Sequence, residues 1–348
     1  MPSPEYRDMA SVLTPSIARP SPVELIRIRD AFTQTRTLRH AGLYQRVRPG
    51  VYASRPEWDR LAPWERYLAR VHAYALVNPG AVFAYESAAA LLGLPVFGEP
   101  TYIHTYDFGR TKTRRFGDVF VHTSVVALET TTLNGHTMTS RAVTAVDLMR
   151  VLPAPFGLAV GDAAISPVQG GTLARADLAA IAEASPNIRG RALVNLLVPM
   201  LDSRSESTGE SVSRGVILWS GFEPPDLQRV FVSEGFTDRV DFWWESVRAI
   251  GESDGYAKYV GATPEETVQR VVAEKRREDR LRRQCHEFGR WDWAASTAIT
   301  PIVRELERMR IPRVSAPRSL LLSTVRDNPR SRPQRTSVPR DASAPGRR

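Results

Sequence analysis

The sequence predicts a multidomain α/β protein that ends in an arginine-rich tail. Its 348 residues favour two or three domains, and its 42% hydrophobic content is enough to form their cores. Segments with helical periodicity alternate with short strand-like runs, which is typical of mixed α/β domains. We expect domains over 1–55, 56–200 and 201–297, then a helix over 298–310 and a tail over 311–348.

The first domain is expected to contain two short helices followed by a basic hairpin. Ser21 could cap a helix over 23–29, and a second helix fits residues 35–41. Pro49-Gly50 then predicts the turn of a hairpin over 42–52. This order is typical of a winged helix-turn-helix. Arg46 and Arg48 alternate with apolar residues, so we expect both to face DNA phosphates, although an ordinary surface hairpin is the alternative.

The second domain is expected to mix short strands with helices. The periodicity predicts a long amphipathic helix over 58–77, strands at 102–104, 119–122 and 125–127, and helices over 140–151, 155–165, 172–184 and 188–201. His104, His122 and His136 fall on strands or loops. Because no His-x-x-x-His or Cys-x-x-Cys pair accompanies them, we expect surface or core histidines and no zinc site.

The third domain carries an acidic hairpin between Arg239 and Tyr259. Buried strands seldom carry carboxylates, because an unpaired charge out of water is costly. A four-residue turn over 245–248 would place Asp241 opposite Glu252, and alternation would place Asp254 on the same face. A two-residue turn over 245–246 would still keep the three acids on one face. Such a patch predicts a site for a hard cation such as Mg²⁺.

Helices on either side of this hairpin carry further candidates. Glu210 lies near the start of a helix that runs to Trp219, and Ser207-x-x-Glu210 forms a capping box, a role compatible with metal binding. A basic helix starts near Pro264. Arg276, Arg280 and Arg283 share a face of it, and the alternative is a solvated helix with internal ion pairs.

The helix glutamate, the hairpin acids, the basic helix and the closing Arg290–Trp293 together resemble the PD-(D/E)XK nuclease superfamily over residues 200–296. The very-short-patch-repair-endonuclease-like domains of actinobacterial proteins are the most similar branch. The resemblance implies a restriction-endonuclease-like α/β domain that hydrolyses DNA phosphodiester bonds with Mg²⁺ or Mn²⁺. The implied metal ligands are Glu210, Asp241, Glu252 and Asp254.

The same resemblance implies further roles. The four acids would form the catalytic group with Lys258, which would hold the scissile phosphate, while Lys275, Arg276 and Arg280 would contact the DNA backbone. One position departs from the superfamily pattern, because Asp254 stands where a lysine is usual. Lys258 follows four residues later and could reach into the site.

The first 200 residues also resemble a known family. Residues 42–53, 84–98, 138–150 and 160–165 are similar to AbiEi-type antitoxin regulators of type IV toxin–antitoxin systems. This implies a winged helix before a compact α/β domain, with DNA and a cognate toxin as partners. The alternative function is therefore a non-catalytic antitoxin or transcriptional regulator whose degenerate nuclease fold serves as a scaffold.

Charge and composition complete the expectations. Of the net charge of +9, residues 311–348 supply +7 through nine arginines and two aspartates. That tail is rich in Pro, Ser and Arg, which predicts disorder. The single cysteine, Cys285, excludes an internal disulfide. No signal peptide and no apolar run of membrane length is evident, so we expect a soluble cytoplasmic protein.

Overall fold

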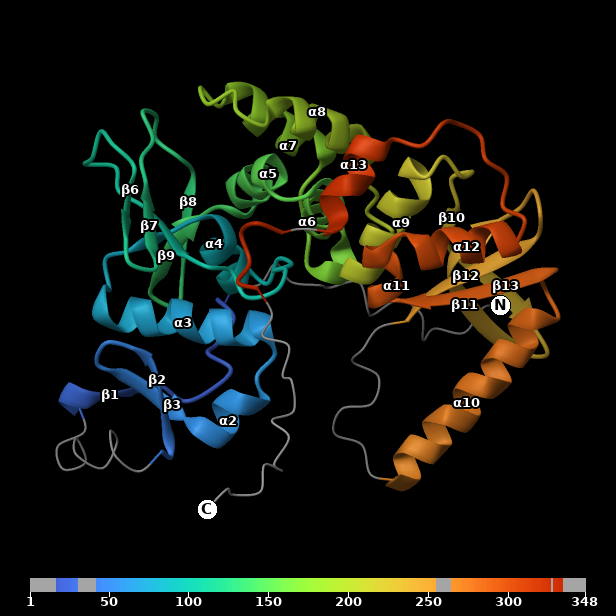
Figure 1. Ribbon diagram of the computed structural model, residues 1–348, viewed down its shortest axis with the longest axis horizontal. Helices are drawn as coiled ribbons and strands as arrows, with labels where there is room; N and C mark the ends of the chain where they lie inside the picture. The colour runs from blue at the N-terminus through green and yellow to red at the C-terminus, as the bar shows by residue number, and fades with distance from the viewer. Residues whose placement is uncertain (1–16, 31–41, 255–263, 327, 334–348) are drawn as a thin grey trace, which may run out of the picture.

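The computed structural model describes residues 17–30, 42–254, 264–326 and 328–333. Within these ranges the protein is mixed α/β, with a three-stranded, a six-stranded and a four-stranded sheet. Figure 1 shows the first two sheets in one half of the molecule and the third in the other half, with α6 between them. None of the described helices is long and apolar enough to cross a membrane.

The three-stranded sheet contains the predicted hairpin. Its strands pair in the order β1-β3-β2, namely β1 (Ile26–Arg27), β3 (Val51–Ser54) and β2 (Tyr44–Arg48). Gly50 takes the positive φ of 78° that the turn needs, which confirms the Pro49-Gly50 turn. The helix expected over 23–29 is wrong, because Ile26 pairs with Tyr52 and a 3-10 turn, η2 (Ile28–Asp30), follows. The helix expected over 35–41 lies outside the described residues.

The long helix expected over 58–77 is two helices, α2 (Arg55–Arg60) and α3 (Pro63–Val77). Pro63 has no amide hydrogen and forces Ala62 into an extended conformation, so the helix is interrupted between α2 and α3. The Glu65 carboxylate accepts a hydrogen bond from the Ala62 amide at 2.8 Å and caps the new helix. In Figure 1, α3 lies between the three-stranded and six-stranded sheets.

The six-stranded sheet has the order β6-β7-β5-β4-β9-β8. Its strands are β4 (Val82–Phe83), β5 (Ile103–Tyr106), β6 (Arg114–Phe116), β7 (Val119–His122), β8 (Thr130–Leu133) and β9 (His136–Thr139). The strands predicted near 102–104 and at 119–122 are confirmed, and residues 125–127 form a bend and loop instead of a strand.

Helices pack against this sheet and against one another. They are α4 (Tyr85–Leu92), α5 (Arg141–Val151), α6 (Ala154–Ile165), α7 (Arg175–Ala184) and α8 (Arg191–Leu197). The last four confirm the predicted helices, although α8 ends early and continues as a 3-10 turn, η4 (Val198–Met200), around Pro199. The largest core of the protein lies here, around Phe83, Leu91 and Leu148.

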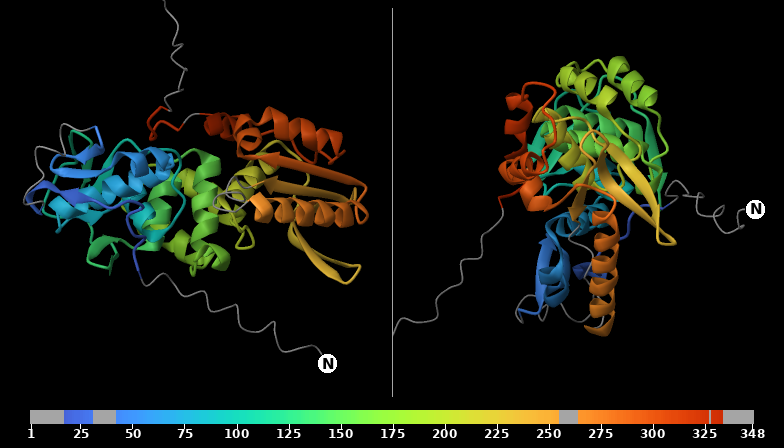
Figure 2. Two further views of the ribbon diagram at one scale, coloured as in Figure 1. Left: turned by 90° about the horizontal axis from the view of Figure 1, so that it is seen from below. Right: turned by 90° about the vertical axis from the view of Figure 1, so that its right-hand side faces the viewer.

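The C-terminal half is built on a four-stranded sheet of order β10-β11-β12-β13. In chain order the elements are α9 (Thr208–Trp219), β10 (Asp226–Ser233), β11 (Phe236–Trp244), β12 (Ala249–Asp254), α10 (Pro264–Arg282), β13 (Glu287–Asp292), α11 (Trp293–Ala298) and α12 (Thr300–Arg308). The first three strands are antiparallel, and β13 runs parallel to β12. Residues of α9 and α12 pack on one face of the sheet, while Leu281 of α10 packs with Trp243 and Ile250. Figure 2 shows this sheet and its helices from two further sides.

The tail is folded over its described part, so the prediction of disorder from residue 311 is wrong for 311–326 and 328–333. It contains α13 (Ser319–Ser323) and a 3-10 turn, η6 (Thr324–Arg326). Ile311 and Val325 are buried, and Thr324 Oγ1 accepts a hydrogen bond from the Ala154 amide at 3.0 Å. The average composition of the tail hides these few apolar anchors. Residues 334–348 lie outside the described ranges.

Candidate functional site

Of the two registers considered for the acidic hairpin, the structure has the one with the four-residue turn. Phe242 pairs with Gly251 and Trp244 with Ala249, so residues 245–248 form the four-residue connection and Asp241 falls opposite Glu252. The Ser253 amide donates a hydrogen bond to Asp241 Oδ2 at 2.8 Å. Alternation then places Asp254 on the face that carries Glu252.

Glu210 reaches the same region from the first turn of α9. Ser207 Oγ accepts a hydrogen bond from the Glu210 amide at 3.2 Å, which confirms that Ser207 caps the helix. Glu210 Oε2 accepts hydrogen bonds from the Glu206 amide and from Gln228 Nε2, both at 2.9 Å. Gln228 was not predicted. It has a left-handed φ of 59°, a strained conformation that the surrounding structure must hold in place.

The three carboxylates Glu210, Asp241 and Glu252 therefore form one group, which we call the acid site. Burial raises the pKa of Asp241 to about 7, and the charges of Glu210 and Glu252 contribute to the rise. Burial also raises the pKa of Glu210. Repulsion between neighbouring acids and loss of hydration both favour the protonated form, so this group holds a proton more readily than separate carboxylates would.

Glu252 is held by an arginine that the sequence analysis did not select. Arg277 of α10 donates from Nη1 to Glu252 Oε2 at 2.9 Å and from Nη2 to Oε1 at 2.8 Å. The Glu252 side chain is only 5% exposed, so this two-point pair is largely shielded from water. Arg277 lies one helical turn before the buried Leu281, and this spacing could have identified it.

A second arginine stands beside the remaining acid. Arg290 of β13 lies 3.4 Å from Asp254 Oδ1, 3.7 Å from Glu252 Oε2 and 2.5 Å from Glu274 Oε1. Arg277 and Arg290 thus place positive charge beside Glu252 and Asp254. Lys258 lies outside the described residues.

This arrangement does not offer an open set of metal ligands. Both oxygens of Glu252 are bound by Arg277, and Glu210 Oε2 already accepts two hydrogen bonds. Among the described residues, no group of three or more His, Cys, Asp or Glu side chains is placed to hold a metal ion. The predicted ligands Asp241, Glu252 and Glu210 are close to one another, but Mg²⁺ would have to compete with the Arg277 guanidinium for the Glu252 carboxylate.

The basic residues of α10 differ in whether their side chains are already held in ion pairs within the protein. Arg280 forms a two-point pair with the buried Asp238, with both hydrogen bonds at 2.8 Å, so its guanidinium is engaged within the protein. Arg283 pairs with Glu234, and exposed Lys275 lies 3.1 Å from Asp279. Arg276 is exposed and forms no ion pair with a described residue.

The two hairpin arginines, Arg46 and Arg48, differ in exposure and in their contacts. A bulge between Arg46 and Arg48 interrupts the alternation, so the expectation that they face the same way is wrong. Arg46 is exposed on β2. Arg48 instead lies 2.6 Å from Asp118 and stacks over the Tyr74 ring at 5.0 Å.

A buried polar cluster in the other half of the protein was also not predicted. Arg330 of the tail binds both oxygens of Glu86, whose side chain is 4% exposed, and lies 3.3 Å from His104 Nε2. His104 Nδ1 in turn lies 2.8 Å from His122 Nε2. Burial lowers the pKa of both histidines, so they are neutral at physiological pH, and the expectation of a core residue is confirmed for His104.

These features define a mixed α/β protein whose C-terminal sheet carries an arginine-paired acid site. Two uncharacterized proteins of Mycobacterium tuberculosis, from strains CDC 1551 and H37Rv, are each 31% identical to it over 219 residues. The alignment covers 62% of this chain and 75% of each relative. The chain therefore belongs to the family of these mycobacterial proteins. No family model and no solved structure matches it.

Proposed function

We propose that this protein is a DNA-binding regulator in which a nuclease-like domain serves as a non-catalytic scaffold. The observation that carries the proposal is the two-point pair between Arg277 and Glu252. A carboxylate held in this way is stabilised as a structural ion pair and is withdrawn from metal binding. Asp254, in the usual lysine position, pairs with Arg290 and adds to the same effect.

The order of elements supports the nuclease-like part of the proposal. The helix glutamate of α9, the hairpin acids of β11 and β12 and the basic helix α10 follow one another as the resemblance implies, around one sheet. The hairpin β2–β3 supports a winged-helix origin for the N-terminal module. A DNA-binding antitoxin would also have a toxin partner, which we propose as the second ligand of this chain.

Exposed cations supply the proposed DNA contacts. Arg46 lies on the hairpin, and Lys275 and Arg276 lie on the solvent side of α10. Side chains of this kind bind phosphates, which gives affinity with little sequence preference.

The proposal is tested by measuring the affinity of the full chain for duplex DNA at several salt concentrations. We expect the logarithm of the binding constant to fall linearly with the logarithm of salt concentration. Arg46→Gln and Arg276→Gln should each reduce the slope by about one phosphate contact. Arg189→Gln, exposed in the loop before α8, is the matched control and should leave the slope unchanged. Absence of duplex binding at low salt would overturn the proposal.

A second candidate is a Mg²⁺- or Mn²⁺-dependent DNA endonuclease. The convergence of Glu210, Asp241 and Glu252 favours it, since gathered carboxylates with raised pKa values are typical of functional sites. The test is nicking of supercoiled plasmid with Mg²⁺ or Mn²⁺ by the wild type and by Asp241→Ala. Metal-dependent nicking that is lost in the variant would establish the nuclease and displace the regulator proposal.

A further inference from the structure

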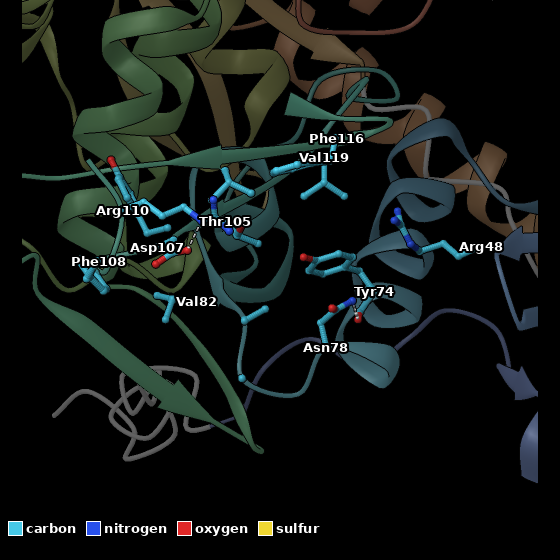
Figure 3. Close-up of a pocket in the computed structure, with 14 residues that line it drawn as sticks. Arg48, Tyr74, Asn78, Val82, Thr105, Asp107, Phe108, Arg110, Phe116 and Val119 are labelled. Carbon is cyan, nitrogen blue, oxygen red and sulfur yellow. Dashed lines mark hydrogen bonds and ion pairs between the residues drawn. The ribbon is translucent and has the colours of Figure 1, made fainter. Parts of the chain in front are cut away.

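A pocket of about 810 Å³ lies far from the acid site, between the N-terminal hairpin, α3 and the six-stranded sheet (Figure 3). Arg48 comes from the hairpin, Tyr74 from α3, and Thr105 and Phe116 from the sheet. The volume falls within the range of sites that bind small ligands. Nothing in the sequence analysis indicated this pocket, because its walls come from separate elements.

The rim of the pocket exposes aromatic rings to solvent. Phe108 is 46% exposed and Phe116 is 49% exposed, and both line the pocket. Aromatic side chains in such positions are platforms for flat ligands, and nucleobases stack on them with little dependence on base identity.

Two hydroxyl groups line the pocket, and neither has a hydrogen-bond partner within the described part of the chain. Thr105 is only 4% exposed, yet its hydroxyl forms no hydrogen bond with any described residue. The Tyr74 hydroxyl is also without a described partner, and Figure 3 shows its ring directed into the pocket. Burial raises the pKa of Tyr74, so the phenol keeps its proton. Neither hydroxyl oxygen is among the buried polar atoms that lack a partner, so both are accessible to solvent, and a polar ligand can bond to them in place of water.

The pocket also offers a cation that can change partners. Arg110 forms an ion pair with Asp107 at 2.6 Å, and their side chains are 45% and 40% exposed. An exposed pair of this kind is weak, so a phosphate could replace the carboxylate at small cost. Arginine is well suited to this, since its planar group binds phosphate through two hydrogen bonds.

We propose that this pocket binds one nucleotide unit. The base packs against Phe116 and Phe108, its polar edge meets Thr105 and Tyr74, and its phosphate pairs with Arg110. A free nucleotide and a nucleotide within a single strand share this chemistry. The proposal goes beyond the proposed function, because it needs neither the acid site nor the exposed cations of α10.

The experiment uses the full chain without added metal. Binding of each deoxynucleoside monophosphate is measured by calorimetry, and binding of a short fluorescein-labelled single strand is measured by anisotropy. Saturable binding of a monophosphate would identify a free nucleotide as ligand, and saturable binding of the strand alone would identify single-stranded nucleic acid. Absence of saturable binding in both arms would overturn the proposal. Duplex binding and plasmid nicking are separate readouts, so their failure is distinguishable from failure here.

Variants locate the bound ligand. Phe116→Ala should weaken binding at least about fivefold through loss of stacking. Thr105→Val, which keeps the side-chain shape, and Arg110→Gln should each weaken it about threefold to tenfold. Arg114→Gln, exposed on the same strand as Phe116 but outside the pocket lining, is the matched control for the monophosphate and should leave affinity unchanged. Equal losses in Phe116→Ala and Arg114→Gln would overturn the assignment, provided that circular dichroism shows both variants folded.

Discussion

Arg277 and Glu252 are joined by two hydrogen bonds of 2.9 and 2.8 Å, although one lies on a helix and the other on the strand that precedes it. This pair fixes α10 against the sheet at the point where the hairpin acids gather. It supplies the charge that a buried carboxylate requires, and it occupies the atoms that a metal ion would use.

Removing the arginine should therefore destabilise the fold. We expect Arg277→Met to lower the free energy of unfolding by roughly 2 to 4 kcal/mol, because Glu252 would remain buried without its partner. Urea denaturation checks this value. The double variant with Glu252→Gln should lose less than the two single variants combined, since the pair acts as a unit. A single-variant change below about 0.5 kcal/mol would show that the pair is not structural.

The same substitution should uncover latent metal binding. With Arg277 gone, the oxygens of Glu252 become available beside Asp241 and Glu210. We expect Mn²⁺ to raise the melting temperature of Arg277→Met more than that of the wild type, because a ligand that binds only the folded state stabilises it. Adding Asp241→Asn to Arg277→Met should abolish this extra rise in melting temperature with Mn²⁺. If the increment persists in that double variant, the metal is bound elsewhere.

Asp241 should make stability depend on pH. Its pKa is raised to about 7 in the folded protein from an ordinary value of 3.8, so the folded state binds the proton more tightly than the unfolded state. Its contribution is fully present below about pH 4 and is lost as pH rises through about 7. Asp241→Asn does not titrate and so does not show this loss. The free energy of unfolding of the variant minus that of the wild type should therefore increase by about 1 kcal/mol or more from pH 5 to pH 8. Denaturation curves at both pH values measure it, and a constant difference would refute the assignment.

Arg330 should contribute far more to the stability of the fold than Arg332 does. Arg330→Gln leaves Glu86 buried and unpaired, so we expect a loss of roughly 2 to 4 kcal/mol. Arg332→Gln removes a pair between more exposed side chains, 43% and 18% exposed, and should cost less than about 1 kcal/mol. Thermal and urea unfolding of the two variants provide the comparison, and similar losses would argue against a special role for Arg330.

The parts of the site that depend on local periodicity were predictable. Strand alternation put Asp241 on the face of Glu252 with either of the two turns considered, and the structure selects the four-residue turn that sets these two residues opposite each other. The cap at Ser207 follows from local sequence. The partners of these acids were not predictable in the same way. The way α10 packs on the sheet determines which of its arginines reach the acids. It places Arg277 beside Glu252 and Arg280 beside Asp238 on β11. Neighbouring residues of a helix point about a quarter turn apart. The helix face predicted from Arg276 therefore did not include Arg277, which is the residue that binds Glu252.

The fold was predictable to a similar extent. Most helices of residues 140–201 were found from their apolar spacing, and the hairpin at Pro49-Gly50 from its turn residues. The short strand at Ile26 escaped detection because its pairing with Tyr52 is a tertiary contact. The ordered part of the tail escaped for the same reason, since its anchors are few and its partners are distant in sequence.

The Arg330–Glu86 contact has a consequence for how the protein is made. The two residues are 244 positions apart, so a ribosome adding about 5 to 20 residues per second delivers the arginine roughly 10 to 50 s after the glutamate. Until then α4 cannot bury Glu86 as a paired charge. The N-terminal half therefore reaches its final packing only after Arg330 has been added to the chain. A chain that stops before Arg330 would carry a buried, uncompensated carboxylate on α4, and we expect its N-terminal half to be less stable than that of the full chain.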